Sequence, residues 1–302
     1  MLAAPLGHPI VAFSGRLLRI AKVRDEPYES LDKPLETLAE IRSLRPLPDL
    51  FTFAQPISDS KPKYDFCQSS DVYAVLPLTT YDKWFKSGID FKTRNKLRKS
   101  PKAGVDIRKV ELTDEFVNGV IDIYNESPIV QGRRNWHYGK NLTEMRAMLA
   151  TFPGRSTFAG AFLGTELIGF IKLVQGKNVV HFMHIIAKSA QRDKAPTNAL
   201  LGKAIELACE SKAAYLHFGI WSRRGLGVFK MNHGFMPHPV PRYYVPLTAK
   251  GKLLVKLGLH RPIKERIPDK WIDMVADLRT KWYSYRQPKR SEPQAEGKLE
   301  VI

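Results

Sequence analysis

The spacing of apolar residues changes repeatedly between a two-residue and a 3.6-residue period along this chain of 302 residues. Alternating or continuous apolar runs predict strands, whereas apolar residues that recur every three to four positions predict helices. In the first eighty residues the pattern predicts strands at residues 16–23, 50–57 and 71–80 and a helix at residues 34–44.

A strongly basic helix is predicted next, over residues 91–102. Asp90 is placed to cap its start, and Pro101 with Gly104 ends it. The segment 91–109 has a single acid, Asp106, among eight cations: Lys92, Arg94, Lys96, Arg98, Lys99, Lys102, Arg108 and Lys109. Such a helix is either a solvated face or a surface that attracts polyanions, and the sequence leaves both interpretations open.

The pattern becomes clearer after residue 104, where strands and helices alternate. Gly164 and Gly176 mark short turns between three of the strands, so these three form an antiparallel meander. The predicted order is strand 105–112, helices 114–127 and 142–151, strands 157–163, 166–174 and 178–187, helix 196–210, strand 214–220, short helix 225–232 and strand 242–247. This order predicts a mixed α+β fold with a mostly antiparallel central sheet flanked by helices.

We predict three parts of the chain from these elements. Residues 1–104 form an N-terminal α/β half that ends in the basic helix, residues 105–248 form the main domain, and residues 249–302 form an extension. Within the extension, residues 268–286 have one apolar helical face and a mixed-charge opposite face, which favours docking on the protein itself over a membrane surface. The last fifteen residues are polar and are predicted to be disordered.

The composition gives a formal net charge of +18, from 48 basic and 30 acidic side chains. A field of this sign attracts nucleic acid, an anionic membrane surface or a phosphate-rich cofactor. The chain has no apolar run long enough for a membrane span, no signal-peptide pattern, and only two cysteines, too few for a disulfide framework. We therefore predict a cytoplasmic protein; the oligomeric state is left open.

The turn between the predicted strand 178–187 and helix 196–210 is a candidate anion site. Pro196 suits the first helical position, which leaves Ala195 as the cap, and alanine has no side-chain acceptor. The amides of Thr197 and Asn198 are then expected to await water or an external anion, with Arg192 and Lys194 beside them. A plain basic loop is the alternative.

The element order resembles that of the Gcn5-related N-acetyltransferase (GNAT) fold. In that family the turn has the form Arg/Gln-x-x-Gly-x-Gly/Ala and holds the pyrophosphate of coenzyme A; here the frame gives Arg192, Ala195 and Thr197. Residues 94–110, 200–220, 225–235 and 242–248 are similar to ordered segments of the FemAB-like branch, which transfers amino acids. The resemblance covers about residues 90–248 and implies a shortened N-terminal GNAT-like half.

The resemblance also implies a role for Lys230, in the short helix before Gly234 and Phe235. Many GNAT enzymes have a tyrosine acid in this slot, whereas FemAB-like enzymes have a lysine. An ammonium beside a developing oxyanion stabilises the transition state more than the ground state. The alternative is a surface lysine without a catalytic role.

The loop 127–140 combines arginines and aromatic residues at the place where a GNAT fold closes over its acceptor. His137 or the preceding Glu126 can take a proton from an attacking amine. Four further residues are candidates for binding the acceptor: Arg133, Arg134, Trp136 and Tyr138. An aromatic plug that seals the helix pair, with solvated arginines, is the alternative reading of this loop.

Metal chemistry is not expected. His181 and His184 are three residues apart in a strand and so are expected to point to opposite faces. The sequence as a whole favours an acyltransferase that moves an acetyl or aminoacyl group from acyl-CoA to a small-molecule or peptide amine. The alternatives are an aminoacyl-tRNA-dependent transferase and a non-catalytic protein that binds nucleic acid or anions on a GNAT scaffold.

Overall fold

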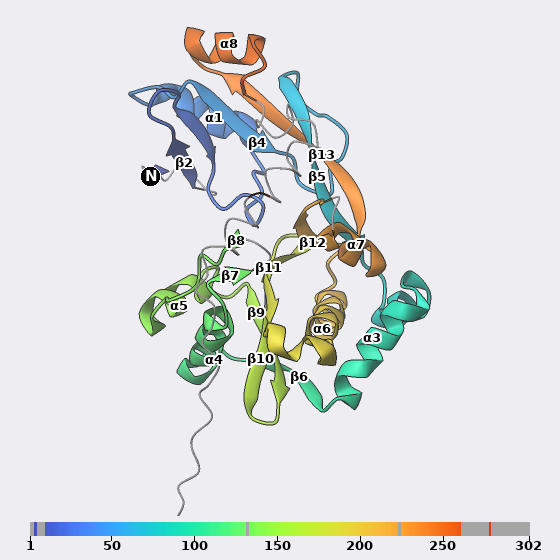
Figure 1. Ribbon diagram of the computed structural model, residues 1–302. Coiled ribbons are helices and arrows are strands. Elements are labelled where there is room, and N and C mark those ends of the chain that lie inside the picture. Colours follow the sequence, from blue (N-terminus) through green and yellow to red (C-terminus); the bar gives the residue numbers. More distant parts are fainter. Residues whose placement is uncertain (1–2, 5–9, 131–132, 223–224, 261–277, 279–302) are drawn as a thin grey trace, which may run out of the picture.

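The computed structural model describes residues 3–4, 10–130, 133–222, 225–260 and 278. Its main feature is one eleven-stranded sheet with the order β1-β2-β3-β4-β13-β5-β12-β11-β10-β9-β6. Most neighbouring strands are antiparallel; β3–β4 and β11–β12 are the parallel pairs within the described residues. The mixed, mostly antiparallel sheet with flanking helices confirms the predicted fold class (Figure 1).

The elements of the upper part in Figure 1 come from both ends of the described chain. Its strands are β1 (Ala3–Ala4), β2 (Val11–Ser14), β3 (Ile20–Val23), β4 (Leu50–Ala54), β5 (Cys67–Pro77) and β13 (Met236–Pro246). Its helices are α1 (Pro34–Ser43) and α8 (Ala249–Lys256).

The remaining part of the sheet carries the meander. Its strands are β6 (Val105–Val110), β9 (Ser156–Leu163), β10 (Glu166–Gln175), β11 (Val179–Ala187) and β12 (Tyr215–Ile220), with a separate hairpin of β7 (Ile129–Val130) and β8 (Arg133–Arg134). Its helices are α2 (Tyr81–Lys83), α3 (Phe91–Lys102), α4 (Asp114–Asn125), α5 (Leu142–Leu149), α6 (Pro196–Glu210) and α7 (Gly225–Asn232), together with the π-helical turn η1 (Trp84–Gly88) and the 3₁₀ helix η2 (Ser189–Lys194).

Two helical layers cover opposite faces of the meander (Figure 1). Leu200, Leu201 and Ile205 of α6 pack on one face, and α3 lies along α6 through Leu97. Val117 and Val120 of α4 belong to the cluster on the other face, together with side chains of α5. This face is called the α4–α5 face below, because the site depends on it.

Side-chain caps begin the helices at the residues the sequence indicates. Asp90 accepts a hydrogen bond from the amide of Thr93, and Thr113 accepts one from the amide of Phe116. Asn141 and Glu144 form a reciprocal capping box at the start of α5. The predicted helix starts at 91, 114 and 142 are confirmed.

The register of β10 and β11 shifts at one point. Phe182 pairs with Leu173 and His184 pairs with Lys172, so Met183 is an extra residue in β11. Directly paired residues share a face, and His181 pairs with Val174. Lys172 and Val174 are two residues apart in β10 and share a face, so their partners His184 and His181 lie on the same face too. The prediction that they point to opposite faces was wrong.

Three other expectations need comment. The first predicted strand, residues 16–23, forms only over Ile20–Val23 (β3), and β2 (Val11–Ser14), which precedes Gly15 and its left-handed backbone, was not predicted. The last strand starts at Met236, six residues before its predicted start. The predicted C-terminal helix, residues 268–286, and the predicted disordered tail lie outside the described residues apart from residue 278. The division at residues 104/105 and 248/249 stays a prediction.

Candidate active site

The sheet opens at the carboxyl end of β11. The parallel pairing of β11 and β12 runs from Val179–Tyr215 to His181–His217 and ends there, although both strands continue. Phe182 and Phe218 stack with their ring centroids 4.5 Å apart in the first step of the opening. This opening, called the fork below, leaves residues 182–187 of β11 without β12 as a neighbour.

The turn after β11 confirms the predicted cap. Ala195 is the N-cap of α6, makes no side-chain cap bond, and has a left-handed backbone with φ of 56°. Pro196 is the first helical residue, and within the described residues no hydrogen bond is recorded for the amide of Thr197. The amide of Asn198, in contrast, donates to the carbonyl of Ala195 at 3.1 Å, so the expectation of two free amides was wrong by one.

The charged side chains of this turn face outward. Arg192 is exposed, while Lys194 is half-buried and lies 3.6 Å from the carboxylate of Asp193. At the start of α6, Pro196 is buried, whereas Thr197 and Asn198 keep partial exposure. The turn is therefore a basic corner that is open to an anion at the start of α6.

Glu126 is bound to this same turn. Its two carboxylate oxygens accept hydrogen bonds from the amides of Ser189 and Ala190, at 2.6 and 2.8 Å. Burial raises the pKa of Glu126, but the amides of Ala190 and Ser189 outweigh burial and lower it. An ionised carboxylate held in this way caps η2 and is a weak base.

Lys230 lies at the fork from the side of α7. Its Nζ donates to the carbonyl of Ile220 at 2.8 Å and sits 4.8 Å from the ring centroid of Phe218. The side chain is 3% exposed, and burial lowers its pKa to about 8. An ammonium has three N–H donors, and the bond to Ile220 uses one of them. The buried position contradicts the alternative of a surface lysine.

The loop after α4 is fixed by one buried amide. Asn135 donates to the carbonyls of Tyr124 and Ser127 and accepts the amide of His137. The next residue, Trp136, is 76% exposed, and the guanidinium of Arg134 lies 5.4 Å from its ring centroid. Tyr138 is also exposed, so neither aromatic side chain plugs the helix pair. For Arg133 the structure places the backbone in β8.

A cluster that the sequence did not indicate lies under this loop, on the α4–α5 face. Tyr124 is in hydrogen-bond contact with His184, and the ring centroid of His137 lies 4.7 Å from Tyr124 and 5.7 Å from His184. Lys172, fully buried beside them, donates to the carbonyls of Leu149 and Thr151. Tyr124 belongs to the apolar stripe of its helix, and the bulge that turns His184 toward it leaves no signal in the sequence.

The structure therefore separates the predicted residues into two groups and one single residue, Lys230. Arg192, Lys194, Thr197 and Glu126 meet at the turn after β11. His137, Arg134, Trp136 and Tyr138 come together in the loop after α4, and Lys230 stands at the fork. The link between the two groups is Glu126, which ends α4 and reaches the turn.

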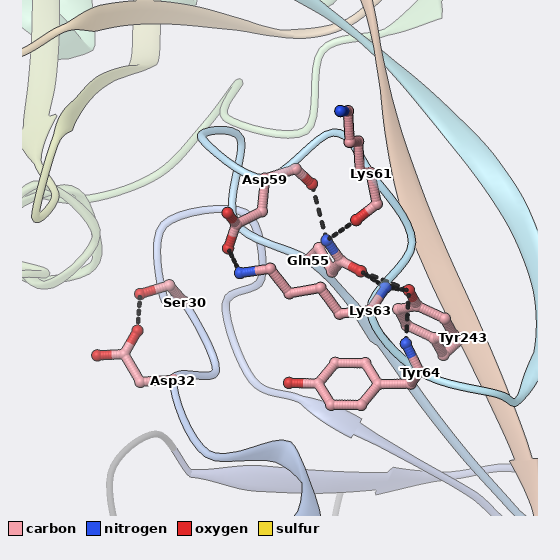
Figure 2. Close-up of polar contacts among 8 residues, drawn as sticks. All are labelled: Ser30, Asp32, Gln55, Asp59, Lys61, Lys63, Tyr64 and Tyr243. Atoms are coloured by element: carbon pink, nitrogen blue, oxygen red, sulfur yellow. Dashed lines mark hydrogen bonds and ion pairs between the residues drawn. The ribbon is translucent and has the colours of Figure 1, made fainter.

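A pocket of about 190 Å³ lies elsewhere, at the opposite end of β11. Its lining includes Asp32, Phe53, Tyr64, and Lys177 of the β10–β11 turn. The carboxamide of Gln55 holds the adjoining loop, since it donates to the carbonyls of Asp59 and Lys61 and accepts from the amide of Lys63 and the hydroxyl of Tyr243 (Figure 2). None of the predicted site residues lines this pocket.

Within the described residues, no group of three or more His, Cys, Asp or Glu side chains is arranged to hold a metal ion. No helix among the same residues is long and apolar enough to cross a bilayer.

Residues 92–230 match the family model described as an acetyltransferase (GNAT) domain. The fold is similar to the C-terminal domain of a putative lysylphosphatidylglycerol synthetase from Agrobacterium fabrum, at 14% identity over 82% of this chain and 84% of that chain, with a TM-score of 0.56. It is also similar to L-PGS from Bacillus licheniformis, at 13% identity over 78% of this chain and 80% of that chain, with a TM-score of 0.53. FemX matches at 11% identity over 82% and 86%, with a TM-score of 0.50. No curated protein matches the sequence.

Proposed function

We propose that residues 92–230, which match the GNAT acetyltransferase model, form an acyltransferase domain that moves an acyl group from acyl-CoA to a primary amine. The observation that carries the proposal is the fork next to the uncapped start of α6. An extended thioester can lie along the free edge of β11 while its phosphates reach the basic corner.

The phosphates of the donor have a suitable partner at this corner. Arg192 and Lys194 supply positive charge, and the amide of Thr197 points out of the helix start. Asn198 was expected to contribute its amide; with that amide engaged, its side chain is the group we propose for this role. Glu126 then orders the turn from the side of α4 instead of acting as a base.

In this proposal the reacting carbonyl of the thioester lies next to Lys230. The amine nitrogen attacks the thioester carbon, the new C–N bond forms, and the C–S bond breaks to release the thiolate. The ammonium of Lys230 stabilises the negative charge that develops on the carbonyl oxygen. A neutral imidazole takes the proton from the amine, and His137 is one candidate.

The acceptor binds at the loop 127–140 in this proposal. The exposed aromatic and cationic side chains of Trp136, Tyr138 and Arg134 surround the path to the α4–α5 face. Arg133 precedes them in the chain. A small amine or a peptide amine that also carries a carboxylate or phosphate suits this composition.

A panel of acyl-CoA donors and primary amines tests the proposal, with released thiol and product mass as the readouts. We expect turnover by the wild type and a loss of kcat of about 10²–10³ in Lys230→Gln, as for removal of one oxyanion donor. Lys252→Gln, an exposed lysine of α8, is the matched control. Absence of turnover with every donor, or full activity of Lys230→Gln with intact fold, contradicts the proposal.

A second donor, aminoacyl-tRNA, is favoured by one observation. Five basic side chains of α3 are exposed: Lys92, Lys96, Arg98, Lys99 and Lys102. If tRNA is the donor, log K falls steeply with log salt, and the double change Lys96→Glu and Lys99→Glu reduces that slope by about two. A shallow slope, unaffected by the double change, leaves acyl-CoA as the donor.

A further inference from the structure

His184 stands in the stretch of β11 that runs past the fork. The pairing with β12 ends at His181, and the bulge at Met183 then turns His184 onto the α4–α5 face. In the proposed function, the thioester lies against this stretch of backbone. That arrangement brings His184 close to the reacting carbon, on the face where the loop 127–140 lies.

The two nitrogens of His184 have different surroundings. Nδ1 lies 3.1 Å from the hydroxyl of Tyr124. Nε2 is buried, and no hydrogen-bond partner is recorded for it in the described part of the chain. A buried imidazole nitrogen without a partner is uncommon in native proteins and calls for an explanation.

The charged and titratable groups around this ring favour its neutral form. His137 approaches from the loop, Lys172 from β10, and Tyr124 from α4. Burial, followed by His137 and Lys172, lowers the pKa of His184 to about 4. Burial also raises the pKa of Tyr124, so the phenol stays protonated.

We propose that His184 is the catalytic base of acyl transfer and that Tyr124 is its positioning residue, an inference that rests on the proposed function. Nδ1–H donates to the oxygen of Tyr124, which leaves the lone pair on Nε2. The amine attacks the thioester carbon while its proton passes to Nε2 of His184. The thiolate leaves, and the imidazolium gives the proton to solvent when the product departs.

His137 is the other imidazole of this cluster, and its position is less suitable for the base. It belongs to the loop and is partly exposed, and burial followed by Lys140 lowers its pKa. Its Nδ1 is buried without a recorded partner in the described residues, like Nε2 of His184. Because the bulge lies in β11 itself, the position of His184 is set by the sheet, whereas that of His137 is set by the loop.

The kinetic test compares His184→Asn with His137→Asn. Asparagine keeps a donor near the place of Nδ1 but removes the base. We expect His184→Asn to lower kcat about 10²–10⁴-fold with KM for the donor unchanged, and His137→Asn to lower it less than 10-fold. Thermal unfolding of both variants checks the fold, and activity of a folded His184→Asn within 3-fold of the wild type overturns the inference.

A second measurement needs no turnover. Nitrogen chemical shifts of His184 are expected to report a neutral ring with the proton on Nδ1 at pH 7, and Tyr124→Phe is expected to mix the two tautomers. A proton on Nε2, or a charged ring at pH 7, overturns the inference whether or not the enzyme turns over. If the wild type has no activity with any donor, the proposed function and the inference fail together; activity retained in His184→Asn defeats the inference alone.

Discussion

The carboxylate of Glu126 accepts the amide of Ser189 at 2.6 Å and so joins the end of α4 to the turn that follows β11. The loop 127–140 begins one residue after Glu126, and α6 begins seven residues after Ser189. One carboxylate therefore fixes the two regions that we assign to the acceptor and the donor. The hydrogen bonds from this turn explain why the pKa of Glu126 is lowered.

Glu126→Gln should weaken the hydrogen bonds between the end of α4 and the turn after β11 without removing a reacting group. We expect KM for acyl-CoA to rise about 3- to 10-fold with kcat nearly unchanged, because the turn is less well ordered before the donor binds. Glu144→Gln, at the start of α5, is a control acid that also accepts a backbone amide. A large fall in kcat with unchanged KM contradicts the structural role and supports Glu126 as a base.

Ala195→Gly should stabilise the protein. The left-handed backbone of Ala195 costs about 1 kcal/mol, and glycine avoids that cost. We expect the free energy of unfolding in urea to rise by about 0.5–1 kcal/mol. Ala103→Gly, at a residue with φ of −87°, is the control and should give no gain. Equal effects of the two changes contradict the assignment of strain to Ala195.

Gln55→Ala should be strongly destabilising. The side chain is 5% exposed and makes four hydrogen bonds, to the backbone of Asp59, Lys61 and Lys63 and to the hydroxyl of Tyr243 (Figure 2). Its removal takes an acceptor from the buried hydroxyl of Tyr243 and donors from the carbonyls of Asp59 and Lys61, and we expect a loss of about 2–4 kcal/mol. Gln68→Ala, an exposed glutamine of β5, should change the unfolding free energy by less than about 0.5 kcal/mol.

The stability of the protein should increase between about pH 8 and pH 10. Burial lowers the pKa of Lys172 to about 8, below that of an unfolded lysine at about 10.4. The unfolded chain therefore binds more protons in this window, and the free energy of unfolding rises with pH. Lys230 acts in the same direction.

Urea unfolding from pH 7 to pH 10 checks this dependence. Lys172→Met should reduce the rise, because Met removes the titrating group and keeps the apolar stem. Lys252→Met is the exposed control and should leave the slope unchanged. A wild-type stability that falls steadily from pH 8 to pH 10 is inconsistent with a neutralised buried lysine.

The sequence by itself determined the order of the main elements and the residues at which the helices begin. Asp90, Thr113 and Asn141 begin helices because a short polar side chain reaches the free amides of the first turn, which is a local interaction. The uncapped α6 at Ala195 and Pro196 follows from the same local chemistry. These features need only residues within a few positions of one another.

Strand β13 shows where local rules stop. Pro237 and Pro239 argue against a strand, yet they lie in the stretch of β13 that pairs with β5 and has not yet reached β4. In this stretch the backbone nitrogens of alternate residues point away from β5, toward the side that β4 does not yet occupy. A proline at such a position therefore removes no hydrogen bond between strands. Only the order of strands in the sheet reveals that free side.

The site depends on the same kind of information. The burial of Lys230, the contact of Glu126 with the turn after β11, and the meeting of Tyr124 with His184 all join residues far apart in the chain. The bulge at Met183 reverses the face of every later residue in β11, and it is set by pairing with β10. Capping is decided within one turn of chain, whereas side-chain direction in a sheet is decided by its neighbours, and for that reason only the tertiary structure brought the cluster around His184 into view.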